Sequence, residues 1–488
     1  MSAHELQIDW KLVLGDVLGS ACGVASDELK DLTAAIGEHS PRAVRLHPSA
    51  DVNALAFETE AIPWFARGRW LNDSQCRPGA FLHYAVGDYY IQDAGSMLAL
   101  ALCDVQPGQT VCDTCAAPGG KSSGMLEQLQ GRGCLISNEV IRSRLELLEL
   151  TLARTGFANY MVTNSEVETL AERFGDSFDC VMVDAPCTGQ SMLARGKQSM
   201  AAFSAKQIDH SAARQQRILR AASQLVKPGG RLVYSTCTFA VAENEGIIRW
   251  LRGENPDWVP LSDPTLAKWE SRDDAGCYRL WPHRDRCAGA FAAALVRPID
   301  ASTLPGPMPA IDFPAKRSRG HGAGQGAGRA ALFSAVNIPA SELTWLKTTE
   351  RAPIQLWRRG SELHYFQADL PQEWIEAAHA GVPVAELRGG EWQPSYASSI
   401  VSSPTFEPAS TFELNAQQAA EYFSGAAIRP ACNDSAPAGS QSAWFALTWQ
   451  NRRLAWSKLA AGVFKNHLPK TLRKSQLTAL PSSASGTR

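Results

Sequence analysis

Two cysteines carry the strongest chemical signal of the chain. Cys187 follows the apolar run 181–184, and Cys237 follows the apolar run 232–236. Each run is rich in β-forming residues and breaks into a polar turn. Open α/β sheets build their sites at the carboxyl ends of their strands, so two thiols at one such crevice, beside Asp184, predict covalent chemistry.

A loop of small residues within the segment 110–123 predicts a cofactor site. It lies between an expected strand and a helix start, and it matches neither the dinucleotide nor the Walker pattern. Glu139 ends the next strand and suits a ribose diol, Arg144 follows it, and Glu166 lies near the end of the third strand. Acidic residues at strand tips without a phosphate cradle predict S-adenosylmethionine as the ligand.

Strand and helix patterns alternate through the middle of the chain, which predicts an α/β fold with βαβ units and a mostly parallel sheet. The expected strands are 110–113, 134–139, 160–163, 180–184, 231–236 and 290–296, and the expected helices are 121–130, 143–155 and 204–226. A Pro-Gly-Gly turn at 228–230 is expected to end the last helix before the strand that leads to Cys237.

We expect five segments along the chain. They are a small α+β domain at 1–85, the α/β domain at 86–300, a Gly-rich basic linker at 301–331, a C-terminal domain of short strands at 332–475 and a flexible tail at 476–488. Expected strands outside the α/β domain include 41–47, 363–367 and 444–448.

Composition limits the function classes. The formal net charge of −2 excludes a chain that is a nucleic-acid polycation throughout. No acidic residue follows Asp434, whereas eight Lys or Arg do, which predicts a surface for a polyanion; a solvated basic terminus is the alternative. No apolar run is long enough to span a membrane, and no leader pattern opens the chain. Twelve cysteines without paired spacing favour reduced thiols and a cytoplasmic protein.

The pair Cys112 and Cys115 forms a C-x-x-C, the spacing of a metal or redox site. No second C-x-x-C accompanies it, and Cys112 lies within an expected strand. We therefore expect no metal site, although a thiol redox protein stays open as an alternative function.

Three motifs in order resemble the signatures of the NOP/Sun family of RNA cytosine-C5 methyltransferases. They read DTCAAPGGK at 113–121, DAPCTG at 184–189 and STCT at 235–238. The resemblance covers about residues 40 to 298 and includes ENE at 243–245. The run GVFKNHLPKTLRK at 462–474 is similar to the tail of the bacterial RsmF-like branch, which modifies 16S rRNA.

The resemblance implies a Rossmann-like S-adenosylmethionine-dependent core with a PUA-like RNA-binding domain at the C-terminus. It implies that Cys237 is the nucleophile that adds to C6 of cytosine and that Cys187 assists product release. Asp184 is expected at N3 of the base, and Lys121 is expected to orient or polarise the base. The implied cofactor contacts are Cys115, Ala116, Ala117, Pro118, Gly119, Gly120, Lys121, Glu139, Arg144, Glu166 and Asp184.

The chain departs from the family pattern at several positions. Gln190 and Ser191 replace an acid-then-glycine pair, and Arg195 stands where lysine is common. Glu166 replaces the usual aspartate, and His47 stands where asparagine is usual. These departures leave the core machinery and put in doubt the RNA target and the adenine contact.

RNA contacts are expected from both ends of the chain. Arginines lie among aromatic residues in the N-terminal block, a combination that suits phosphate contacts and base stacking; an aromatic core with ordinary surface arginines is the alternative. These residues are Arg42, Arg45, Arg67, Arg69, Trp64, Phe65 and Trp70. In the C-terminal block, the basic run 465–474 is expected to hold phosphates.

The leading hypothesis is methyl transfer from S-adenosylmethionine to C5 of a cytosine in rRNA, most simply 16S rRNA. A tRNA substrate is the alternative within the same enzyme class. A non-catalytic RNA-binding factor in ribosome assembly is the alternative in another class, and the intact Cys187, Cys237, Asp184 and Lys121 argue against it.

Overall fold

The structure is a computed structural model that describes residues 28–299, 333–339, 342–347, 355–367, 369–402, 406–430 and 443–474, and residue 477. The expected linker at 301–331 lies outside the described residues, as does nearly all of the expected tail.

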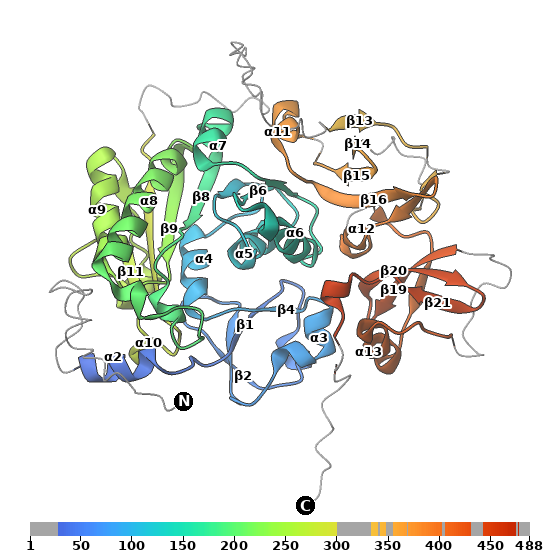
Figure 1. Ribbon diagram of the computed structural model, residues 1–488, viewed down its shortest axis with the longest axis horizontal. Helices are drawn as coiled ribbons and strands as arrows, with labels where there is room; N and C mark the ends of the chain where they lie inside the picture. The colour runs from blue at the N-terminus through green and yellow to red at the C-terminus, as the bar shows by residue number, and fades with distance from the viewer. Residues whose placement is uncertain are drawn as a thin grey trace, which may run out of the picture.

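An eight-stranded mixed sheet forms the centre of the molecule (Figure 1). The strand order is β10-β12-β9-β8-β5-β6-β7, and β11 pairs with β12; β5 to β9 are parallel, whereas β10, β11 and β12 pair antiparallel. The strands are β5 (Thr110–Asp113), β6 (Cys134–Asn138), β7 (Tyr160–Thr163), β8 (Phe178–Asp184), β9 (Val226–Thr236), β10 (Val259–Pro260), β11 (Cys277–Leu280) and β12 (Ala290–Val296). The chain continues from β5 to β6 and β7 on one side and then crosses to β8, which pairs with the other side of β5. This change of direction forms a crevice at the carboxyl ends of β5 and β8. The expected Rossmann-like sheet is confirmed.

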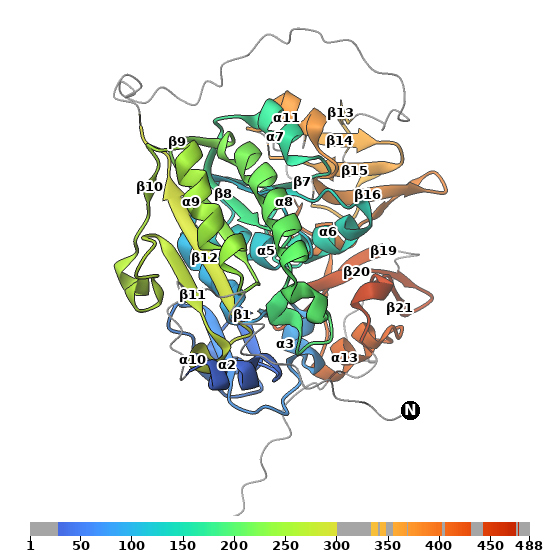
Figure 2. The same cartoon turned by 60° about the vertical axis from the view of Figure 1, so that its left-hand side comes forward.

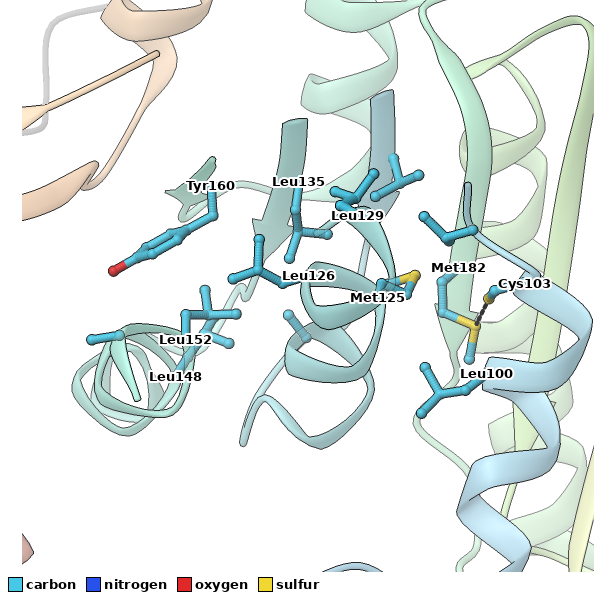
Figure 3. Close-up of a cluster of buried hydrophobic side chains, with 14 of the residues drawn as sticks. Leu100, Cys103, Met125, Leu126, Leu129, Leu135, Leu148, Leu152, Tyr160 and Met182 are labelled. Atoms are coloured by element: carbon cyan, nitrogen blue, oxygen red, sulfur yellow. Dashed lines mark hydrogen bonds between the residues drawn. The ribbon is translucent and has the colours of Figure 1, made fainter. Parts of the chain in front are cut away.

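Helices cover both faces of this sheet. On one face lie α4 (Leu98–Cys103), α5 (Gly120–Leu129) and α6 (Leu145–Ala153), and on the other lie α7 (Val167–Phe174), α8 (Ala205–Ser223) and α9 (Glu245–Glu254), as Figure 2 shows for α8 and α9. Strand residues alternate between the two cores, since Val111 packs with α4–α6 and Cys112 with α7–α9. Figure 3 shows the first core, where Leu126 lies near Leu135 and Leu148.

One predicted turn has a different place. The Pro-Gly-Gly sequence 228–230 lies inside β9, where it shifts the pairing register with β8 between Phe178 and Cys180. Gly229 has a φ of 78°, and its amide donates to the Arg297 carbonyl. Helix α8 ends earlier, at Ser223, and β9 begins at Val226. The turn residues are thus an irregularity within the strand because β12 supplies partners for them.

The N-terminal region folds into a four-stranded antiparallel sheet of order β2-β3-β1-β4. The strands are β1 (Ala43–Leu46), β2 (Thr59–Ala61), β3 (Gly68–Leu71) and β4 (Tyr89–Ile91), and the helices of this region are α2 (Leu29–Ile36) and α3 (Leu82–Ala85). Strand β4 lies beyond residue 85, so this sheet extends into the segment expected to begin the α/β domain.

The aromatic residues of this region are core residues and not a base-stacking surface. The Trp64, Phe65 and Trp70 side chains are buried, with exposed fractions of 3%, 8% and 5%. Arg45 is also buried, and it pairs with Glu127 of α5 across the boundary between the two sheets. The expectation that these residues stack on RNA is wrong, because the rings pack against α4 and the loop around Trp269.

The C-terminal region contains two sheets where the sequence predicted one domain. The first has the order β13-β14-β15-β16-β17 and the second the order β18-β19-β20-β21. Their strands are β13 (Ser334–Val336), β14 (Leu356–Arg359), β15 (Glu362–Tyr365), β16 (Val382–Arg388), β17 (Glu391–Pro394), β18 (Thr411–Glu413), β19 (Ala443–Trp449), β20 (Arg452–Ala460) and β21 (Val463–Asn466); the helices are α11 (Gln372–Ala377), α12 (Tyr396–Ile400) and α13 (Ala416–Ser424). This region lies beside α3 and α6 (Figure 1).

Candidate active site

The loop 115–120 joins β5 to α5 and forms one wall of the crevice. Gly119 has a φ of 102°, and a Cβ atom there would lie 2.8 Å from the Thr151 side chain, so glycine is required. The peptide bond before Pro118 is cis. At the start of the loop, burial raises the pKa of Asp113 to about 7. The loop 115–120 contains no large side chain, as the sequence predicted.

Glu139 lies at the carboxyl end of β6, where a ribose-binding acid was expected. Its side chain is buried, and Oε1 accepts a hydrogen bond of 2.9 Å from the Ile141 amide. Its Oε2 lies 3.1 Å from an Arg144 guanidinium nitrogen. Arg144 also donates a 2.5 Å hydrogen bond to the Ala117 carbonyl. Glu139 and Arg144 therefore tie the tip of β6 to the cofactor loop.

Glu166 has a different environment from the other predicted acids. Its side chain is 55% exposed and lies 3.2 Å from Arg217 of α8. A buried polar group lies at the end of the neighbouring strand β6. It is the Asn138 side-chain amide, which donates to the Thr114 and Ser165 carbonyls. The sequence pattern carried no signal for Asn138, because its two partners come from the ends of two other strands, β5 and β7.

The residues present fit S-adenosyl-L-methionine. Glycine at 119 and 120 lets the loop pack closely on its neighbours, since a Cβ atom on Gly120 would lie 3.3 Å from the Tyr90 ring. The Glu139 carboxylate has lone pairs left for two ribose hydroxyl groups. An acidic strand tip suits an adenosyl group and disfavours a phosphate.

The two predicted thiols are neighbours. The Sγ atoms of Cys187 and Cys237 lie 3.4 Å apart, and the Cys237 amide also donates to the Cys187 sulfur. The hydrogen bond from Cys187 lowers the pKa of Cys237, against the effect of burial. The same hydrogen bond, together with burial, raises the pKa of Cys187. The pair therefore favours a thiolate at Cys237 and a thiol at Cys187.

Lys121 and Asp184 form an ion pair beside the thiols. The Lys121 Nζ lies 2.7 Å from Asp184 Oδ2, and the Ser235 hydroxyl donates to Oδ1 at 2.8 Å. Burial opposes the charge on Lys121, but the Asp184 carboxylate and the Cys237 sulfur raise its pKa overall. The Lys121 cation also helps to lower the pKa of Cys237. All four expected reactive side chains thus lie at one place.

A buried glutamate connects the two thiol-bearing loops. Glu243 is fully buried, and its carboxylate accepts hydrogen bonds from the Thr188 amide at 3.0 Å and the Thr188 hydroxyl at 2.5 Å. It also accepts from the Gln215 amide group at 2.8 Å and from the Thr238 hydroxyl at 3.3 Å. Burial raises the pKa of Glu243. No role was expected for Glu243, although it is the first residue of the ENE fragment.

Two departures from the family pattern have structural explanations. The fully buried Gln190 side chain donates to the Ala202 carbonyl and accepts from the Phe239 amide, so it braces the loops next to both thiols. Arg195 lies 2.8 Å from Asp93 of the N-terminal region. Neither side chain replaces a reactive group.

The C-x-x-C cysteines lie at the start of the cofactor loop. Both are free thiols; burial raises the pKa of Cys112 well above its usual value and that of Cys115 to about 12. Within the described ranges, no cluster of three or more His, Cys, Asp or Glu side chains could hold a metal ion. Over the same part of the chain, no helix combines the length and apolar character that crossing a bilayer requires.

Comparison with known families matches two parts of the chain. Residues 99–296 match the family described as 16S rRNA methyltransferase RsmB/F, and residues 409–474 match the methyltransferase RsmF PUA domain. The second match covers the sheet β18–β21 and α13.

Relatives and solved structures agree with these matches. The chain is 28% identical to ribosomal RNA small subunit methyltransferase F of Shigella boydii and 27% identical to that of Escherichia coli, over 84% of each chain. A methyltransferase homolog from Pyrococcus horikoshii has a TM-score of 0.51 at 27% identity and covers 58% of this chain and 94% of its own. NSun6 from the same organism, solved with SFG, shares the fold with a TM-score of 0.52 at 16% identity, over 60% of this chain and 98% of its own.

The sheet order, the cofactor loop and the strand-tip acid define a Rossmann-like methyltransferase with S-adenosyl-L-methionine as its cofactor. A PUA RNA-binding domain follows it at the C-terminus. The methyltransferase domain and the C-terminal domain of the chain are thus similar to those of the RsmB/F group of 16S rRNA methyltransferases.

Proposed function

We propose that this enzyme methylates C5 of a cytosine in small-subunit rRNA, through a transient bond between the Cys237 sulfur and C6 of the base. The observation that carries the proposal is the 3.4 Å separation of the two sulfur atoms, with the pKa of Cys237 lowered and that of Cys187 raised. A nucleophile and a second proton-transfer group of this kind are what C5 methylation of a pyrimidine requires.

Addition to the ring is the first chemical step. The Cys237 thiolate adds to C6, and the ring electron pair moves toward N3, which takes a proton. The proton comes from the Lys121 ammonium group, which lies 2.7 Å from the Asp184 carboxylate, and Asp184 passes it to N3. The C4–C5–C6 unit is then an enamine, and C5 has become a nucleophile.

Methyl transfer and release follow. S-adenosyl-L-methionine, when bound, supplies the methyl group. C5 then carries a methyl group and a hydrogen, and Cys187 takes this hydrogen as a proton. The C5–C6 double bond forms again, Cys237 leaves C6 as a thiolate, and N3 returns its proton through Asp184 to Lys121.

The change in charge at Cys237 prepares Cys187 for its role. Its hydrogen bond with Cys237 is the largest cause of the raised pKa of Cys187. When the Cys237 sulfur is bonded to carbon, its negative charge is gone, and this cause disappears. Cys187 can then release its proton to solvent and act as a base.

The cofactor contacts are proposed from the same geometry. Glu139 and Arg144 hold the ribose, the loop 115–121 and Asp184 border the methionine end, and Glu166 lies on the adenine side. The remaining exposure of Glu166 leaves its carboxylate accessible to a ligand.

The substrate assignment rests on the family and the relatives, whose names specify the small-subunit rRNA. We propose rRNA, free or within a ribosomal subunit, in the cytoplasm, as the substrate. Because both thiols are only partly exposed, the target cytosine must leave its stack before it reaches them.

The experiment is methylation with radiolabelled S-adenosyl-L-methionine of small-subunit rRNA, assembled small subunits and tRNA, followed by mapping of 5-methylcytosine. We expect label at one cytosine of the small-subunit rRNA. Label in tRNA alone would replace the substrate, and label at a ring nitrogen or a ribose would exclude the Cys237 mechanism. A protein that binds RNA and transfers no methyl group would be a non-catalytic factor.

A further inference from the structure

A cavity lies where the three parts of the molecule meet. It has a volume of about 450 Å³, and its walls come from the N-terminal sheet, the carboxyl end of α6 and the β19–β20 hairpin. His47 and Gly87 represent the first, Arg154 the second, and Asn451 and Arg452 the third. The hairpin tip thus brings the matched PUA region against the N-terminal sheet, where Arg452 contacts Asp88, and beside the end of α6.

Three arginines line this cavity: Arg154, Arg452 and Arg453. Among the described residues that line it, none is acidic. Arg452 is paired with Asp88 at 2.5 Å, just outside the lining. No carboxylate of the described residues forms an ion pair with Arg154 or Arg453, although Glu407 acts on Arg453 from a greater distance. With Asp88 and Glu407 counted against three arginines, the cavity carries an excess positive charge.

The neutral contacts of two arginines leave hydrogen-bond donors unused. Arg154 donates to the Tyr84 carbonyl, but its buried Nε has no partner among the described residues. Arg453 donates through one nitrogen to the Val401 and Phe406 carbonyls, and burial lowers its pKa. A buried donor without a partner is costly, so an acceptor at this place would be stabilised.

We propose that this arginine-lined cavity binds a phosphate group of the RNA substrate. A phosphodiester supplies both the negative charge and the acceptor oxygens that Arg154 and Arg453 lack. The inference rests on the proposed function only in taking RNA as the ligand.

Contacts along β4 connect this cavity with the cofactor loop. Asp88, at one end, holds Arg452 of the cavity, while Gln92, at the other, accepts a hydrogen bond from Arg45. Arg45 in turn donates to the Gly120 carbonyl of the cofactor loop. Four residues of extended chain span about 13 Å, so about this distance along β4 separates the contact of Asp88 with the cavity from the contact of Gln92 with Arg45.

Two substitutions test the proposal without touching the reactive groups. Arg453→Gln removes a cation, and Asn451→Asp adds a carboxylate at an exposed turn with almost no change in shape. Arg388→Gln is the matched control, because Arg388 is 63% exposed, is paired with Glu386 and does not line the cavity. The variants are compared only if their melting temperatures equal that of the wild-type protein. Asn451→Asp is expected to meet this condition even if Arg453→Gln does not fold.

Binding of a labelled small-subunit rRNA fragment is measured over a range of salt concentrations. We expect both cavity variants to weaken binding several-fold and to reduce the slope of log K against log salt by about 0.7 to 0.9, whereas the control does neither. Methylation at saturating RNA keeps its kcat, and KM rises. Unchanged affinity and slope in both variants would overturn the inference.

Inorganic phosphate provides the second arm. Thermal stabilisation by phosphate that is lost in the variants, with RNA affinity unchanged, would mean a small-anion site and would also overturn the proposal. If the wild-type protein methylates no cytosine but the variants still weaken RNA binding, the proposed function fails and the phosphate site stands.

Discussion

The Sγ atoms of Cys187 and Cys237 lie 3.4 Å apart, although 50 positions separate the residues in the chain. Parallel pairing of β8 with β9 brings the two loops together, since Asp184 pairs with Ser235 in the register. At this distance the thiol of one cysteine donates a hydrogen bond to the thiolate of the other, so their pKa values separate. The opposite shifts in the pKa values of Cys187 and Cys237 therefore depend on the register of these two strands.

The two thiols should fail in different ways. Cys237→Ala should lower methyl transfer by about 10³-fold or more, because no other thiolate reaches the base. Cys187→Ala should allow addition but block release, which leaves a protein–RNA adduct. Denaturing gel electrophoresis with labelled RNA would detect it as a slower band. Turnover at the wild-type rate in both variants would exclude covalent catalysis.

The pH dependence of Cys237 should depend on Cys187. The hydrogen bond from Cys187 is the largest cause that lowers the pKa of Cys237, so Cys187→Ala should raise that pKa. The thiolate fraction at any pH below the new pKa is then smaller, and alkylation by iodoacetamide should be slower there. The measurement is the alkylation rate against pH, with Cys237→Ala as the blank. A profile that does not move upward would contradict the assigned cause.

Glu243 should act as a positioning residue for both thiol loops. Its carboxylate joins Thr188 to Thr238, the residues directly after the two cysteines. Glu243→Gln keeps the shape and one acceptor, whereas Glu243→Ala leaves Thr188 and Gln215 without their partner. We expect kcat to fall about tenfold in the first and more in the second, with little change in KM for RNA.

A purely structural role for Glu243 can be separated from positioning. In the Cys187→Ala background, Glu243→Gln should slow adduct formation, whereas a protein that is only less stable would form adduct at the normal rate per folded molecule. Arg220→Gln, at an exposed pair with Glu254, is a suitable control. A normal rate of adduct formation in Glu243→Gln would exclude positioning.

The buried pair Arg45–Glu127 should stabilise the contact between the N-terminal sheet and α5. The two side chains are 1% and 7% exposed and lie 2.9 Å apart. Arg45→Met leaves the Glu127 charge buried and should cost about 3–5 kcal/mol of unfolding free energy. Because Arg45 also holds the Gly120 carbonyl, binding of S-adenosyl-L-methionine should weaken.

Urea unfolding and calorimetric titration of the cofactor would measure the two effects of Arg45→Met. Adding Glu127→Leu should recover much of the stability, because no charge then remains buried, but it should not recover the cofactor affinity. Recovery of both together would mean that Arg45 does not position the loop.

Local patterns predicted six of the eight strands of the central sheet, whereas β10 and β11 were not expected. β5, β7 and β12 have the predicted bounds, because short, mostly apolar runs bounded by turns have few other ways to fold. The helix expected at 143–155 begins only at Leu145, after a short 3-10 turn at Arg142–Arg144. End residues are decided by caps and contacts that periodicity does not contain.

Side-chain environments were less predictable. Trp64 and Trp70 look like a stacking surface in the sequence but are buried against α4 and Trp269. Gln190 looked like a change at the reaction centre, but its side chain forms hydrogen bonds with two backbone groups, the Ala202 carbonyl and the Phe239 amide. Whether a polar or aromatic side chain faces solvent, ligand or core depends on segments far away in the chain.

By itself, the sequence determined the α/β class, the cofactor loop and the pair of cysteines at strand ends, because these follow from local propensity and from the spacing of residue types. Only the tertiary structure decided that Cys187 and Cys237 touch, that Glu243 joins their loops and that three arginines meet in one cavity. Each of these depends on the register of strands and on contacts between distant parts of the chain, which are determined by packing and not by any local pattern.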